Sequence, residues 1–185
     1  SSSAASDVYK RQLEMFADGF YAAIFKAAML GICFILLLAL SLIDFRYKAV
    51  PDPLLFASVA FSLLYGFNLP ASFDSEGLLH AFDSFINAAI FMFAFWLLRA
   101  VVSLALKREA MGSADIFIAG VMGAILGIKL GLMAIYVSAL LTLPAYVIVQ
   151  KRGYELPFVP FLSLATLIVY AFKDWFIYIL GLIYG

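Results

Sequence analysis

The chain has 185 residues, a length that predicts a single domain. Hydrophobic residues make up 66% of it and charged residues only 13%, whereas ordinary soluble domains carry about 25% charged residues. This composition excludes a water-soluble globule and predicts an all-α fold, a polytopic bundle of membrane helices. The formal net charge is zero, so no basic surface indicates binding to nucleic acid.

The first twelve residues, SSSAASDVYKRQ, differ from the rest because they are small and polar and lack an apolar period. We expect residues 1–12 to be a disordered tail or a remnant of cloning or sequencing, and residues 13–185 to form one membrane-embedded domain. No small-residue cleavage site follows the first apolar run, which is therefore expected to anchor the protein. The single cysteine, Cys33, cannot form an internal disulfide or a multi-cysteine metal site.

About six apolar segments are expected to lie in the membrane as helices. A hydrocarbon core of about 30 Å requires ~20 helical residues, so the second segment is short for a full crossing. The segments are residues 23–43, 53–67, 85–106, 114–127, 132–150 and 161–184. The charged pair Lys173-Asp174 offers an alternative for the last segment, in which it divides into a shorter span and an interfacial tail.

Three features of these segments call for separate interpretation. The stretch 68–83 contains the only histidine, His80, which we expect to be a loop residue rather than a metal ligand. Arg99 interrupts the third segment and needs a partner inside the bundle or a route to the surface. The fourth segment contains a GxxxG pair, Gly123 and Gly127, together with Gly120, and such small residues allow another helix to approach closely.

The basic residues of the short loops are shared unequally, which predicts the orientation in the membrane. Six of them follow the first, third and fifth segments, and one follows the second or fourth. The six are Arg46, Lys48, Lys107, Arg108, Lys151 and Arg152, and the one is Lys129. We therefore expect the first, third and fifth loops to be cytoplasmic.

Two aspartates lie beside these basic loops. Asp44 closes the first apolar run, and Asp115 stands 71 residues later at the start of the fourth. Carboxylates at membrane edges are rare because desolvation penalises their charge, so they are functional candidates. Two close aspartates do not readily ionise together, so one keeps a proton while the other acts as a base. Such a pair can hydrolyse a peptide bond without a metal or cofactor, and the sequence predicts neither.

Other interpretations of the aspartates remain open at this point. Each could cap a helix or pair with a neighbouring basic side chain. A small transporter could use them as a proton relay, although we find no convincing internal repeat of the kind that transporters show. A purely structural assembly protein would leave both aspartates unexplained.

At these residues the sequence resembles the type IV prepilin peptidases, which are membrane aspartic proteases of the GxGD class. Their first motif, an aspartate that closes a span before a proline turn, is matched from Asp44 to Asp52. Their second, glycine-x-glycine-aspartate after a basic loop, is matched from Gly112 to Asp115. A loop similar to their Pro-Phe-x-Pro-Phe sequence occupies residues 157–161, and the resemblance covers roughly residues 23–172.

The resemblance implies that Asp44 and Asp115 are the catalytic pair. It implies cleavage of short basic leaders from type IV prepilins, or from pseudopilins of type II secretion, at the cytoplasmic face of the bacterial inner membrane. Residues of the motifs are then candidates for substrate binding or structural support, namely Asp52, Gly112, Ala114, Pro157 and Pro160. We expect Asp52 to cap the second helix, with attraction of the leader's positive charges as the alternative.

Two departures from the family pattern are visible. Ala114 replaces the second glycine of the motif, and only a backbone position with positive φ would disfavour that change. Many relatives that also N-methylate the new terminus carry a cytoplasmic domain with paired CxxC motifs, which these 185 residues do not contain. The sequence therefore predicts cleavage without methyl transfer.

Overall fold

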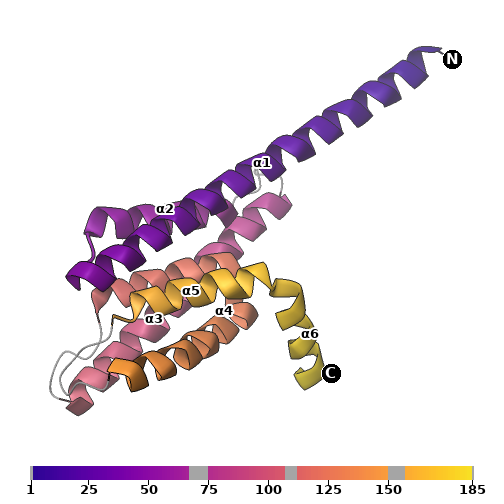
Figure 1. The fold of residues 1–185 in the computed structure, drawn as a ribbon. Helices are drawn as coiled ribbons and strands as arrows, with labels where there is room; N and C mark the ends of the chain where they lie inside the picture. The colour runs from indigo at the N-terminus through magenta and orange to yellow at the C-terminus, as the bar shows by residue number, and fades with distance from the viewer. Residues whose placement is uncertain (1, 67–74, 107–111, 150–156, 185) are drawn as a thin grey trace.

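The computed structural model describes residues 2–66, 75–106, 112–149 and 157–184. The regular structure in these ranges is entirely helical, as the composition predicted, and Figure 1 shows the helices gathered into a bundle from which the start of the chain projects. The helices are α1 (Ser2–Tyr47), α2 (Asp52–Gly66), α3 (Ser75–Leu106), α4 (Ser113–Val149), α5 (Val159–Ala171) and α6 (Lys173–Tyr184). Within the described ranges, α1, α3 and α4 are long and apolar enough to cross a membrane, and α5 with α6 adds a fourth if that bent pair is one span.

Two helices begin earlier than the sequence suggested. Helix α1 begins at Ser2, so residues 2–12 are helical where we expected a disordered tail. Helix α3 begins at Ser75, and the exposed His80 therefore lies on a helix and not in a loop. Residues 68–74, the remainder of the expected loop, lie outside the described part of the chain.

Helix α4 consists of two helical segments joined at Gly127. This glycine has φ 69° and ψ −175°, and positive φ is accessible to glycine without a steric cost. Figure 1 shows that the chain turns back here, so the two segments of α4 run in opposite directions. They correspond to the predicted segments 114–127 and 132–150, but the turn falls at Gly127 rather than in the residues between these segments.

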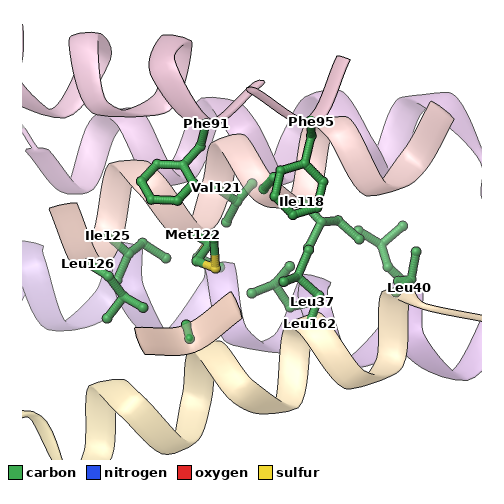
Figure 2. Close-up of a cluster of buried hydrophobic side chains, with 14 of the residues drawn as sticks. Leu37, Leu40, Phe91, Phe95, Ile118, Val121, Met122, Ile125, Leu126 and Leu162 are labelled. Atoms are coloured by element: carbon green, nitrogen blue, oxygen red, sulfur yellow. The ribbon is translucent and has the colours of Figure 1, made fainter. Parts of the chain in front are cut away.

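The first segment of α4 forms the centre of the bundle. Every residue from Ile118 to Leu126 is buried, as expected for a helix that is apolar on all sides. Figure 2 shows side chains from three other helices around it: Phe91 and Phe95 of α3, Leu37 and Leu40 of α1, and Leu162 of α5.

Close packing of α4 against α3 depends on glycine. A Cβ atom at Gly123 would lie 2.6 Å from the carbonyl oxygen of Asn87, and one at Gly120 would lie 2.5 Å from Cγ of Met92. A side chain at Gly123 would meet backbone atoms, whereas one at Gly120 would require the Met92 side chain to move. Of the predicted GxxxG pair, Gly123 therefore packs against a neighbouring helix, whereas Gly127 breaks its own helix.

Helices α5 and α6 are separated by a bend of 83°. The break falls at Phe172, whose backbone N–H still bonds to the carbonyl of Ile168 at 3.0 Å. It lies directly before Lys173-Asp174. The chain therefore bends beside this charged pair, while the division into a shorter span and an interfacial tail stays a prediction.

Candidate functional site

Asp44 lies in the last turn of α1. It continues the stripe formed by the buried side chains of Cys33, Leu37 and Leu40, which faces the bundle at helical spacing. The Asp44 side chain is itself only 8% exposed. The local sequence therefore places a carboxylate where an apolar side chain would be expected.

The end of α1, next to Asp44, has a defined geometry. Lys48 has φ 52°, and its backbone N–H bonds to the carbonyl of Asp44 at 2.9 Å. A left-handed residue that closes a helix through this bond is the αL capping motif, which glycine usually occupies. The guanidinium of Arg46 lies over the ring of Tyr47, 5.7 Å from its centroid. The chain then turns through Val50 and Pro51 into α2.

Asp115 is the third residue of α4 and is 4% exposed. The backbone N–H of Gly112 hydrogen bonds to its carboxyl group, as an acidic residue at this position of a capping box does. Its Oδ1 atom is buried and has no hydrogen-bond partner among the described residues. A capping role therefore accounts for one hydrogen bond of Asp115 but leaves one carboxyl oxygen unexplained.

The structure brings the two aspartates together. Asp44 lies in the last turn of one helix and Asp115 in the first turn of another that runs in the opposite direction, and Asp44 is close enough to act electrostatically on Asp115. Arg99 of α3 also acts electrostatically on Asp115. The sequence indicated that Arg99 needs a partner or a route to the surface, but it gave no signal that Asp115 would be nearby.

With this geometry in place, comparison with known proteins identifies the family. The model of the type IV leader peptidase family matches residues 31–147. The chain belongs to this family. No curated protein and no solved structure gives a match.

A type IV leader peptidase is a membrane-embedded hydrolase that acts on peptide bonds, so the predicted family and the general class of activity are confirmed. The match spans both aspartates, as well as Asp52, Gly112 and Ala114. Pro157 and Pro160 lie beyond it.

The motif around Asp115 in this leader peptidase does not depend on glycine conformations. Among the described residues, only Lys48 and Gly127 have positive φ, so Gly112 and Ala114 have backbones that alanine can adopt. A Cβ atom at Gly112 would lie 3.5 Å from Oδ2 of Asp115, an ordinary contact. Ala114 is buried in the first turn of α4, where its methyl group is accommodated.

The other motif residues of the peptidase lie at helix starts. Asp52 is exposed and is the first residue of α2, and the carbonyl of Pro51 accepts bonds from Leu54 and Leu55 at 3.2 and 3.3 Å. An acidic residue in a first turn is stabilised by the helix dipole. Pro160 lies in the first turn of α5, a position that tolerates proline, and Pro157 precedes it. The basic residues Lys107, Arg108, Lys151 and Arg152 lie outside the described residues.

Proposed function

We propose that this leader peptidase is an aspartic endopeptidase in which Asp44 and Asp115 activate water. The observation that carries the proposal is the pair itself: two carboxyl groups from two helices are buried and the charge of Asp44 acts on Asp115. One oxygen of Asp115 is also buried without a hydrogen-bond partner among the described residues. Such an arrangement costs stability, since an unsatisfied buried polar group is penalised by about 1–3 kcal/mol. Functional sites are where such costs are expected to persist.

The mechanism follows from sharing one proton between the two carboxyl groups. The ionised carboxylate accepts a proton from water as the water oxygen attacks the carbonyl carbon of the scissile peptide bond. The protonated carboxyl donates a hydrogen bond to the carbonyl oxygen, which gains negative charge. The C–N bond then breaks as a proton passes to the leaving nitrogen, and the pair returns to its starting charge. Either aspartate can hold the proton at the start of this cycle.

The proposed substrates are type IV prepilins or pseudopilins with a short basic leader. The proposed site faces the cytoplasm of a bacterial inner membrane, because six of the seven basic residues of the short loops follow the first, third and fifth apolar segments of the sequence. The exposed carboxylate of Asp52 lies in the turn that follows Asp44. It would attract a basic leader weakly and in a salt-dependent way.

Substitution of each aspartate by asparagine tests the proposal. Asparagine is nearly isosteric and still forms hydrogen bonds, but it cannot accept a proton from water. We expect Asp44→Asn and Asp115→Asn each to lower the rate of leader cleavage by at least ~10²–10⁴-fold. The double variant should be little worse than either single one, because members of such a unit are not additive. The measurement is cleavage of a purified prepilin by the peptidase in detergent or liposomes.

Asp174→Asn is the matched control, since Asp174 is exposed on α6. It should cleave at the wild-type rate, and thermal unfolding should show that all variants are folded. Near wild-type cleavage by either Asp44→Asn or Asp115→Asn would exclude the aspartic mechanism. A proton-relay transporter would then become the better hypothesis, and proton uptake by loaded liposomes would be measured.

A further inference from the structure

Three polar side chains lie where the apolar core ends at one end of the bundle. On each of three helices, a buried residue of the core is followed one turn later, toward this end, by a charged residue. The pairs are Leu40 and Asp44 on α1, Phe95 and Arg99 on α3, and Ile118 and Asp115 on α4. Figure 2 shows the three apolar members near one another in the core. The charged members therefore form the next layer.

The register of α3 against α4 supports this placement of Arg99. Gly123 lies against Asn87, and Gly120 lies against Ala88 and Met92, so the two helices run antiparallel. Continuing this register toward the start of α4 brings Asp115 to the turn of α3 that precedes Arg99. Side chains on a helix lean toward its N-terminus, so on antiparallel helices Arg99 and Asp115 lean toward each other.

We infer that Arg99 is a positioning residue for the aspartate pair, whose guanidinium stabilises the single negative charge that the pair must carry to activate water. The inference rests on the proposed function, since only an aspartic mechanism requires that charge. Arg99 is half-buried, and a guanidinium remains charged in proteins. It touches neither water nor substrate in this scheme, but acts through the two carboxyl groups.

The groups around Asp115 show why a cation matters here. Burial and the neighbouring Asp44 both oppose a negative charge on Asp115, whereas the N–H of Gly112 and the charge of Arg99 favour it. On α2, Asp52 is exposed, and on α5 the one titratable residue is Tyr170, whose hydroxyl pairs with that of Tyr65 at 3.4 Å. Among the described residues packed against the first turn of α4, Arg99 is the cation that acts on Asp115.

Without the cation, the pair should retain both protons to a higher pH. An opposite charge within a few ångströms favours the ionised form of a carboxyl group by about one pH unit or more. For Arg99→Gln we therefore expect kcat/KM on a purified prepilin to fall about tenfold on the acid side of the pH profile. The acid limb should move to higher pH, and activity should recover at alkaline pH.

Two further variants separate this role from a structural one. Arg99→Lys keeps the charge and should restore most of the activity and the wild-type profile. Lys129→Gln removes a charge from an exposed position just beyond Gly127, a glycine that lies about 18 Å along α4 from Asp115, and should leave the profile unchanged. If Arg99→Gln loses activity equally at all pH values, or if Arg99→Lys fails to restore the profile, the inference is wrong.

An infrared titration distinguishes failure of this inference from failure of the proposed function. The carbonyl stretch of protonated carboxyl groups is followed against pH without substrate, and the signal of the Asp44→Asn, Asp115→Asn double variant is subtracted. The remaining signal should persist to higher pH in Arg99→Gln than in the wild type. An unchanged titration would overturn the inference even if both aspartates prove catalytic. A shifted titration in a protein whose aspartates are dispensable would instead exclude the proposed mechanism.

Discussion

Asp44 lies at the end of α1 and Asp115 at the start of α4, and both lie at the same end of the bundle. The two helices that carry them have different surroundings. In the apolar stretch of α1, 17% of the residues are buried, against 50% in that of α4. Asp115 lies at the start of a segment that is enclosed on all sides, whereas Asp44 lies at the end of a helix with one buried stripe. The position of Asp115 is therefore fixed by packing along the whole segment, and that of Asp44 depends more on how α1 ends.

The two aspartates are therefore held in place in different ways, Asp115 by packing along α4 and Asp44 by the local geometry at the end of α1. Close-packed interiors transmit small displacements, so a change several turns away in α4 should reach Asp115. The last turn of α1 is defined locally, by one backbone bond and one left-handed residue. Changes at the two sites should therefore differ in both size and direction.

Cysteine labelling tests whether both aspartate ends lie at one membrane face. Lys48→Cys and Ser113→Cys, both at exposed positions, should react with a membrane-impermeant reagent from the cytoplasmic side, and Lys129→Cys only from the opposite side. The native Cys33 is fully buried and should stay unlabelled. Each cysteine should therefore be labelled fully from one side of the membrane and not at all from the other. Labelling of Lys48→Cys and Lys129→Cys from the same side would contradict the topology.

Gly123→Ala tests the support of Asp115 by packing. The added methyl group would lie 2.6 Å from the carbonyl oxygen of Asn87 and 2.7 Å from Cδ2 of Phe91, so α3 and α4 must separate. Overpacking of this kind costs about 1–3 kcal/mol, and we expect lower thermal stability together with slower cleavage. Gly31→Ala on α1 is the control, because no atom lies within 4 Å of its added methyl group. Equal unfolding temperatures for the two variants would disprove this account of the packing.

Lys48→Gly tests the local support of Asp44 and should have the smallest effect. A residue other than glycine in the left-handed region costs roughly 1–2 kcal/mol, so glycine should stabilise the protein by about 1 kcal/mol. Lys48→Ala removes the same side chain but keeps Cβ, and it controls for any lost interaction of the lysine. A rise in unfolding temperature with glycine and not with alanine is expected. The same rise in both would assign the effect to the side chain.

Much of the architecture could be predicted because segments that contact lipid must be apolar, and the sequence shows which segments are. The apolar runs located the helices, and the glycines of residues 120–127 indicated a tightly packed segment. Because consecutive membrane segments alternate in direction, the positions of Asp44 and Asp115 also predicted that both lie at one end. The packing of α4 inside the bundle brings the two carboxyl groups close enough for Asp44 to act on Asp115. That packing depends on side-chain contacts, which hydropathy does not predict.

The missed features involve polar residues within helices. Residues 75–83 are helical although they follow no apolar period, because a helix can extend beyond the apolar run that identifies it. Arg99 stood out as a charge in an apolar segment, but its partner lies on another helix, and that relation depends on the register of α3 against α4. The position of the turn at Gly127 was missed by a few residues because the apolar pattern placed it between the two apolar segments, at residues 128–131.

The enclosure of the first segment of α4 has a consequence for how the protein is made. Its neighbours come from both sides of it in the chain: α2 and α3 precede it, whereas α5 follows it. When the ribosome has just completed Asp115, the chain already contains both aspartates but only part of the surroundings that bury them. The site can take its final form only after Val159–Ala171 has entered the membrane and packed against α1 and α4. Synthesis of the last helices therefore sets the earliest moment at which a nascent chain can become active.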